Sequence, residues 1–132
     1  MLEEQFKALA DGNRLRIINL LLNGEYCVCE LEVFLGLTQS NLSRHLGKLK
    51  SSGIIDAKKD GQWVYYTISE DLKMGNPLLH QHLQTKLRED PLYQKDVERM
   101  DNYKKNRLTC SLIRENKEQV IQIIDPECSC GK

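Results

Sequence analysis

Five cysteines are the residues of this 132-residue chain best suited to specific chemistry. Cys27 and Cys29 flank a single valine in the stretch EYCVCELE, Cys110 stands alone, and Cys128 and Cys130 form a second pair near the C-terminus. Cysteine thiolates bind soft metal ions and metalloids, or they oxidise to disulfides. In a reducing compartment, cysteines indicate metal or redox chemistry more than structural disulfides.

The composition and the N-terminal residues indicate such a compartment. The first residues, MLEEQFKALADGNRL, are acidic and amphipathic, which is unlike a secretory signal. No apolar run approaches the roughly 20 residues that span a bilayer. We therefore expect a cytoplasmic protein with no membrane partner, in which the thiols stay reduced. The length allows one domain, or one domain with a tail, and leaves little room for a large enclosed active site.

The spacing of Cys27 and Cys29 poses a geometric problem if both lie on one helix. With Leu31 at the centre of the buried face, Cys27 lies about 40° away and Cys29 about 160° away at 100° per residue. Two thiolates so placed cannot share an ion while the helix stays regular. Ion binding therefore requires a first turn that unwinds, frays or is already irregular beside Gly24. Such a distortion is a suitable switch, because a ligand can bias it.

Thiolates without a matching histidine cluster favour arsenic(III) or antimony(III) as the bound species, with cadmium, lead or zinc as alternatives. Trivalent arsenic takes three thiolates in a pyramid, so Cys27 and Cys29 need a third ligand. Cys110, Cys128 or Cys130 is available, from the same chain or from a partner chain. The tail pair can also form a second site, or simply scavenge the ion.

Other interpretations of the cysteines remain open. Cys27 and Cys110 can be small core residues, with an inert tail. A repressor whose thiols oxidise is a second possibility, and a thiol-dependent metal carrier or enzyme is a third. The chain contains no Cys-x-x-Cys motif, no cysteine paired with a nearby histidine and no glycine-rich cofactor loop, so we expect that it is not an enzyme.

The elements around the first cysteine pair predict a DNA-binding fold. A short helix over CVCELEVFLG and a longer one over QSNLSRHLGKLKSS meet at Gly36, which is the pattern of a helix-turn-helix. After them, two β-rich runs flank Asp60-Gly61, a strong hairpin signal. Short helices over 2–9 and 13–22 precede these elements. The sequence therefore predicts a mainly α fold with a small β-hairpin: a winged helix-turn-helix.

The predicted second helix and hairpin concentrate basic charge in a chain whose net charge is zero. Residues 38–68 carry five bases against two acids, as expected for a surface that meets phosphate. Major-groove reading needs donors and acceptors, and phosphate anchoring needs cations. The expected base-reading residues are Gln39, Ser40, Asn41, Ser43 and Arg44. The expected phosphate contacts are Lys48, Lys50, Lys58 and Lys59, with Gln62 and Tyr65 assisting from the hairpin. His45 borders the apolar face, so we assign it a structural role or a phosphate contact.

Helices are also expected after the hairpin, over 77–87 and 91–108, and a weaker helix or strand over 112–124. Leucines at one face of the first of these predict a dimer surface: Leu78, Leu79, Leu83 and Leu87. We divide the chain into a DNA-binding domain over 1–75, dimerisation helices over 76–110 and an extension over 111–132. A zinc site can be drawn from His80, His82, Glu89 and Asp90, but a solvated helix face is the preferred interpretation of these residues.

In order and spacing, three stretches resemble the ArsR/SmtB family of metal-sensing repressors: ALADGNRLRIINLLL, LTQSNLSRHLGKLKSSGII and DGQWVYYTIS. Together they span roughly residues 8–69. The resemblance implies a homodimer whose recognition helix enters the major groove of a palindromic operator, with release on metal binding. CVCEL is similar to the metalloid motif of the arsenic-responsive branch, but Glu32 stands where that motif has a third cysteine.

Overall fold

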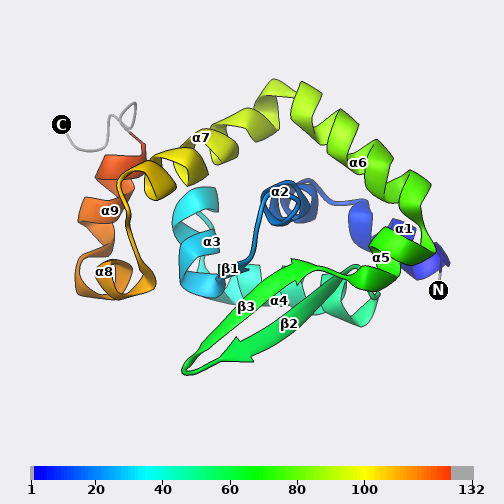
Figure 1. The fold of residues 1–132 in the computed structure, drawn as a ribbon, viewed down its shortest axis with the longest axis horizontal. Coiled ribbons are helices and arrows are strands. Elements are labelled where there is room, and N and C mark those ends of the chain that lie inside the picture. The colour runs from blue at the N-terminus through cyan, green and yellow to red at the C-terminus, as the bar shows by residue number, and fades with distance from the viewer. Residues whose placement is uncertain (1, 126–132) are drawn as a thin grey trace.

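The structure is a computed structural model that describes residues 2–125, so Cys128 and Cys130 lie outside the described residues. The elements are α1 (Leu2–Leu9), α2 (Gly12–Leu21), β1 (Tyr26–Cys27), α3 (Val28–Leu35), α4 (Gln39–Ser51), β2 (Ile55–Asp60), β3 (Trp63–Ile68), α5 (Glu70–Gly75), α6 (Pro77–Glu89), α7 (Pro91–Lys105), α8 (Cys110–Glu115) and α9 (Lys117–Ile124). Figure 1 shows α2 at the centre, with α6 and α7 along one side and the β2–β3 hairpin along the other.

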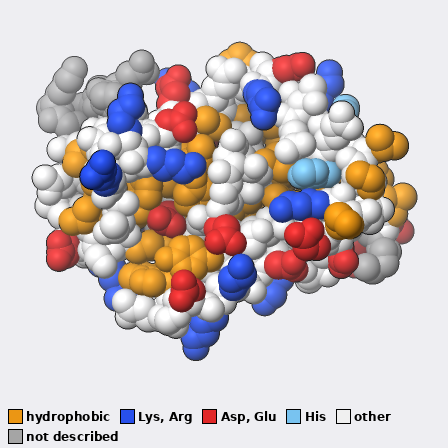
Figure 2. Space-filling view, viewed as in Figure 1, with side chains coloured by type: hydrophobic (Ala, Val, Ile, Leu, Met, Phe, Trp, Pro, Cys, Tyr) orange, Lys and Arg blue, Asp and Glu red, His pale blue; other side chains and the backbone are white. Residues whose placement is uncertain are grey.

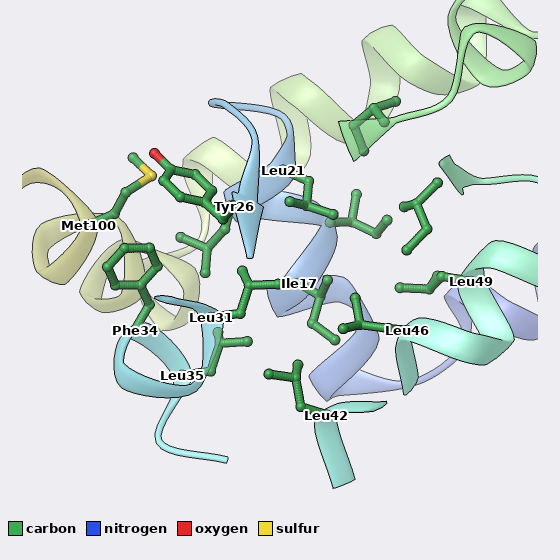
Figure 3. Packing of buried hydrophobic residues seen from close by; sticks show 14 of the residues in the cluster. Ile17, Leu21, Tyr26, Leu31, Phe34, Leu35, Leu42, Leu46, Leu49 and Met100 are labelled. Atoms are coloured by element: carbon green, nitrogen blue, oxygen red, sulfur yellow. The ribbon is translucent and has the colours of Figure 1, made fainter. Parts of the chain in front are cut away.

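Helix α2 (Gly12–Leu21) is the central core element, because its apolar residues cover most of its circumference. Asp11 caps its N-terminus, because its carboxylate accepts hydrogen bonds from the backbone N–H groups of Asn13 and Arg14. Ile17, Ile18 and Leu20 are completely buried. Figure 3 shows Ile17 between Leu31 of α3 and Leu46 of α4, so α2 supports both helices of the helix-turn-helix.

The helix-turn-helix forms where the sequence predicts it. Gly36 ends α3 with a φ of 69°, a left-handed conformation that glycine adopts without a Cβ clash. Thr38 caps α4, and its hydroxyl accepts the backbone N–H of Asn41. Leu42, Leu46 and Leu49 point inward from α4 and are almost completely buried. The opposite face of α4 therefore stays in solvent.

The hairpin forms a wing, but its sheet has an additional strand. Strands β2 and β3 pair antiparallel with Asp60 opposite Trp63, so the two-residue turn is Gly61-Gln62, one residue later than the expected Asp60-Gly61, and Gly61 has a φ of 65°. The short strand β1 pairs with the other edge of β3, with Cys27 opposite Tyr65, and gives a three-stranded sheet within the described residues. Residue 27 is therefore extended and not helical. The helix expected over the whole of CVCELEVFLG begins one residue later, at Val28.

The C-terminal helices complete the same hydrophobic core. Leu83 and Leu87 of α6 are 7% and 5% exposed and belong to the core cluster, so the expected dimer stripe is wrong at these two positions. Their burial follows from the packing of α6 on α2. Leu79 is partly buried against the core, and Leu78 remains 78% exposed.

The segment after α7 folds back onto α3. Helices α8 and α9 both pack against α3, and Ile113, Val120 and Ile124 join the core cluster. The expected boundary between residues 110 and 111 falls inside α8. The segment over 112–124, expected as a helix or strand, is helical. Among the described residues no helix has the length and apolar character needed to cross a bilayer.

Candidate metal centre and nucleic-acid surface

The thiols of Cys27, Cys29 and Cys110 converge. Their Sγ atoms all lie within 4.8 Å of one another, and the Sγ atoms of Cys27 and Cys29 are 3.0 Å apart. The three residues come from three elements: Cys27 from β1, Cys29 from the first turn of α3, and Cys110 from the start of α8. Within the described part of the chain, this is the one group of three or more potential metal ligands this close together.

The backbone at Cys27 resolves the geometric problem that the Cys-x-Cys spacing poses. Cys27 is the N-cap of α3, with φ −87° and ψ 171°, so it precedes the helix and is free of the 100° helical rotation. Its side chain can therefore turn toward Cys29. Glu30 stabilises this start of the helix, because its Oε1 accepts the backbone N–H of Cys27 at 3.0 Å. The first turn thus holds two thiols together with α3 regular.

Burial and mutual hydrogen bonding keep the inner thiols protonated. Cys27 and Cys110 are 2% and 7% exposed, whereas Cys29 is half-buried. The hydrogen bond with Cys29, together with burial, raises the pKa of Cys27 far above its ordinary value. Burial, with the hydrogen bond from Cys27, raises the pKa of Cys110 to about 12. Any ligand that bonds to these sulfurs must therefore displace their protons.

A buried carboxylate lies behind the thiols. Glu30 is 9% exposed, and its Oε2 accepts the hydroxyl of Tyr103 from α7 at 2.6 Å. Burial, together with this bond to Glu30, raises the pKa of Tyr103. The sequence offers a signal for the Glu30 cap, which is the acid three residues after the N-cap. It offers none for Tyr103, which is 73 residues away.

A second buried network fixes the C-terminal helices to α3. Asp96 of α7 is 1% exposed and accepts hydrogen bonds from Arg16 and Arg99. The two arginines also donate to the last carbonyls of α3: Arg16 to Leu35 at 2.7 Å and Arg99 to Phe34 at 3.1 Å. These bonds satisfy carbonyls that a helix end leaves without intrahelical partners. The network therefore holds α7 and α3 in one arrangement.

Glu32 takes part in a further tie between α3 and the C-terminal helices. It stands where the family resemblance leads one to expect a third cysteine, and its Oε1 accepts a hydrogen bond from Nζ of Lys117 in α9 at 3.1 Å, as part of an ion pair. Cys110 supplies a third thiol from a different element. Among the third ligands expected from the sequence, Cys110 lies beside Cys27 and Cys29, whereas Cys128 and Cys130 lie outside the described residues.

The expected DNA-reading residues share the exposed face of α4 and the wing. The exposed members are Gln39, Ser40, Asn41, Ser43, Arg44, Lys48 and Lys50 on α4, and Lys58, Lys59 and Gln62 on the wing. Tyr65 is partly buried. Arg44 donates to the side chain of Asn41 at 3.0 Å, which positions both polar ends on this face.

His45 does not share that face. It is 3% exposed, and its Nδ1 lies 3.2 Å from a guanidinium nitrogen of Arg14 in α2. Burial lowers its pKa, so the ring is neutral at physiological pH. The structure places His45 inside the protein, in the structural role that was one of its two expected roles, and removes it from the DNA-facing set.

The alternative zinc ligands in the C-terminal helices do not form a comparable group. His82 is exposed and His80 half-buried on α6. Glu89 pairs with Lys86 at 3.8 Å, and Asp90 caps α7 by accepting the backbone N–H of Leu92. Glu89 and Asp90 thus serve a surface ion pair and a helix cap.

Comparison with known proteins gives these features a family. Residues 11–57 match the family model described as bacterial regulatory protein, arsR family. The arsenic resistance transcriptional regulator ArsR2 of Pseudomonas putida is 41% identical over 83 residues, which are 62% of this chain and 70% of that protein. The cadmium resistance regulatory protein CadC of Listeria innocua is 42% identical over 72 residues, 54% of this chain and 60% of that protein. For some relatives, the matched part spans about half of their length.

The fold has solved relatives as well. The homodimeric winged helix-turn-helix domain of Mb0332 from Mycobacterium bovis, a possible ArsR-family regulator, is 35% identical with a TM-score of 0.54, and the match covers 60% of this chain and 74% of that one. The two sequence relatives are transcriptional regulators and not enzymes, as the sequence predicts for this chain. The family model matches residues 11–57, one relative is 41% identical over 70% of its length, and a solved relative shares the winged fold. The chain therefore belongs to the arsR family of bacterial regulatory proteins.

Proposed function

We propose that the protein is a cytoplasmic, homodimeric transcriptional repressor that binds operator DNA through α4 and the wing. Arsenic(III) or antimony(III) bound by Cys27, Cys29 and Cys110 causes its release. The observation that carries this proposal is the convergence of three thiols from three elements at one buried point. Three sulfurs match the number of ligands that trivalent arsenic takes, and soft thiolates suit these elements.

Charge balance supports a trivalent metalloid over a divalent metal ion. Arsenous acid, As(OH)3, exchanges its three hydroxyls for three thiolates. The hydroxyls leave with the thiol protons as three waters, and the As(SR)3 product is neutral. A divalent ion must release three protons and leaves a net negative charge on the sulfurs. Such a charge is costly when buried, and here the carboxylate of Glu30 lies nearby. Cadmium, lead and zinc are therefore the weaker candidates.

The elements that carry the thiols explain how binding can reach the DNA surface. Cys29 belongs to α3, which is joined to α4 by the tight turn at Gly36. Cys27 belongs to β1, which pairs directly with the wing strand β3. Bonds to one shared atom change the spacing of the three sulfurs and thereby move both DNA-binding elements relative to the core. An ion that prefers one arrangement thereby biases the equilibrium between bound and released forms.

Exposed apolar side chains support the homodimer. Leu2 and Phe6 of α1 are 55% and 52% exposed, and Met74 and Leu78 of α5 and α6 are each 78% exposed. Figure 1 draws α1 and α5 at the same end of the molecule, and Figure 2 shows hydrophobic side chains at that edge. A second copy that covers this end would remove their apolar surface from water. This surface replaces the buried Leu83 and Leu87 in the proposed interface.

The test measures release of the protein from a labelled DNA fragment that contains the promoter region upstream of its own gene. Fluorescence anisotropy reports the release on addition of arsenite, antimonite, cadmium, lead or zinc. Arsenite should release wild type, whereas Cys27→Ser, Cys29→Ser and Cys110→Ser should bind DNA normally and resist release. The double variant Cys128→Ser/Cys130→Ser is the matched control and should respond like wild type.

Each departure from this pattern has a distinct meaning. Unchanged arsenite release from Cys110→Ser would refute the three-thiol site. Loss of release in the tail variant instead would assign the third ligand to Cys128 or Cys130. Release by peroxide without any metal, with no response to arsenite, would identify a thiol-redox repressor. Failure of wild type to bind any DNA would overturn the proposed function.

A further inference from the structure

A cavity of about 280 Å³ lies between α2, α6 and α7, and the proposed function does not use it. Figure 1 draws α6 and α7 along one side of α2. Buried residues form its floor: Asn19 of α2, Leu87 of α6 and Tyr93 of α7 are 4%, 5% and 8% exposed. Exposed residues form its rim, among them Arg88 of α6 and Glu98 of α7. The three thiols of the candidate metal centre do not line this cavity, so it is a separate place on the molecule.

Hydrogen bonds fix the orientation of three side-chain amides in the cavity wall. Asn19 donates through Nδ2 to the carbonyl oxygen of Tyr93 at 3.1 Å, and Asn23 donates to that of Asn19 at 2.8 Å. Gln94 donates through Nε2 to the carbonyl oxygen of Arg88 at 3.1 Å. Because the nitrogen of an amide donates and its oxygen accepts, the three side-chain oxygens stay available as acceptors. Within residues 2–125 no group donates to them, so the wall suits a ligand that donates hydrogen bonds.

The oxygen of the Asn19 side chain is the most informative of these acceptors. Asn19 is almost completely buried, and polar atoms in such side chains ordinarily have hydrogen-bond partners. In the described part of the chain, the hydroxyl of Tyr26 is the one side-chain nitrogen or oxygen that is sealed from solvent without a partner. The oxygen of Asn19 therefore keeps contact with solvent, and it does so through the cavity that Asn19 lines. A donor in the cavity would complete the hydrogen bonding of this amide.

Two opposite charges line the same cavity without pairing. Among the described residues, neither the guanidinium of Arg88 nor the carboxylate of Glu98 has an ion-pair or hydrogen-bond partner. Much of the remaining wall is apolar, with Leu22, Leu87 and Val97. A guanidinium binds a carboxylate, and a carboxylate binds an ammonium group. The cavity therefore matches a small molecule that carries both charges and an apolar part.

We infer that this cavity binds a small zwitterion, an aliphatic α-amino acid, as a second ligand of the protein. Its carboxylate lies against Arg88, and its ammonium group donates to Glu98 and to the side-chain oxygen of Asn19. Its alkyl group packs against Leu22 and Val97. An apolar cavity of about 150 Å³ holds benzene, so a cavity of about 280 Å³ has room for leucine. The site uses none of the thiols, so the inference is independent of the proposed function.

The test is isothermal titration calorimetry of the full chain with leucine and three compounds that each lack one of its features. Isoamylamine lacks the carboxylate, isocaproate lacks the ammonium group, and free glycine lacks the alkyl group. Leucine should bind, and each of the other compounds should bind at least about tenfold more weakly, because each loses one set of contacts. No detectable binding of leucine, or equal binding of any of the other three, would overturn the inference.

Two exposed side chains offer variants that keep the fold. Because the side chains of Arg88 and Glu98 have no partners among the described residues, Arg88→Gln and Glu98→Gln should unfold like wild type. Each should weaken leucine binding about tenfold. Glu98→Gln should bind isocaproate as wild type does, and Arg88→Gln should bind isoamylamine as wild type does, because each compound lacks the group that the missing charge contacts.

The matched control is Glu118→Gln, which removes an exposed carboxylate on α9 that does not line the cavity. It should bind leucine like wild type. Unchanged leucine affinity in both Arg88→Gln and Glu98→Gln would overturn the inference, as would an equal loss in the control. Both cavity variants should keep wild-type release from DNA by arsenite. Failure of wild type to respond to arsenite would refute the proposed function instead, so the two failures are distinguishable.

Discussion

Replacement of Asp96 by alanine should loosen the attachment of the C-terminal helices to the DNA-binding core. The carboxylate accepts hydrogen bonds at 2.9 Å and 3.0 Å from Arg16, and at 3.0 Å from Arg99. The Asp96 side chain is 2% exposed, and those of the two arginines are 22% and 24% exposed. Asp96→Ala therefore leaves two guanidinium groups facing a largely dry region without their shared partner.

The structure allows a rough magnitude for this change. Removal of one partner from a buried ion pair costs about 3–5 kcal/mol. Because the two arginines keep some contact with water and retain their bonds to Leu35 and Phe34, the lower end applies. We expect the free energy of unfolding to fall by about 3 kcal/mol, a large part of the roughly 5–15 kcal/mol that stabilises a typical domain.

The assay is urea unfolding followed by far-ultraviolet circular dichroism, at one fixed protein concentration because the proposed dimer makes stability concentration-dependent. Lys7→Ala is the matched control, since it breaks an exposed Lys7–Glu3 pair whose side chains are 75% and 80% exposed. That variant should lose less than about 0.5 kcal/mol. Asp96→Ala should also weaken arsenite binding, because Cys110 is then positioned less firmly beside Cys27. A loss below about 1 kcal/mol, or equal to that of the control, would refute the role assigned to the network.

Three further predictions concern the thiols, the turn and the wing. Since the pKa of Cys27 is raised and that of Cys110 is about 12, both stay protonated near pH 6–8. A divalent ion that releases three protons should therefore bind about 1000-fold more tightly per pH unit in calorimetry, whereas arsenite affinity should change less than about threefold. Gly36→Ala forces alanine to a φ of 69° and should lower the free energy of unfolding by about 1–2 kcal/mol in urea titrations. Arg114→Gln removes the contact with Trp63, so it should shift the fluorescence emission of the chain's single tryptophan. Because that contact ties α8, which carries Cys110, to the wing, arsenite binding should weaken about two- to fivefold in calorimetry. Unchanged emission, unchanged stability or equal pH slopes for the two ligand classes would contradict the respective argument.

The helix-turn-helix and the wing can be predicted from the sequence because the residues that end one element and begin the next lie within a few positions of each other. The turn at Gly36 needs a left-handed residue, the cap at Thr38 needs a side-chain oxygen, and the hairpin turn needs the left-handed Gly61 after Asp60. Each requirement is met within a few residues of the element that it ends or begins. The leucines of α4 likewise repeat at the helical period, so the sequence also predicts which face of α4 is exposed to solvent.

The prediction that Leu83 and Leu87 lie in a dimer surface was wrong, because helical periodicity identifies an apolar face but not the surface that it packs against. Leu83 and Leu87 form a helical stripe whether their partner is another chain or the same one, and here the partner is α2. His45 was ambiguous for the same reason. Its position beside the apolar face of α4 allowed two roles, and only the location of Arg14 decided between them.

By itself, the sequence predicted two thiols at the start of α3 as candidate ligands, and it determined that they could share a ligand only if the first turn departed from a regular helix. Tertiary structure decided how that happens and what completes the group. Pairing of β1 with β3 holds Cys27 in an extended conformation. Packing of α7, α8 and α9 on α3 brings Cys110, 81 residues beyond Cys29 (110 − 29), to the same point. Contacts over that separation depend on the whole core, which no local pattern encodes.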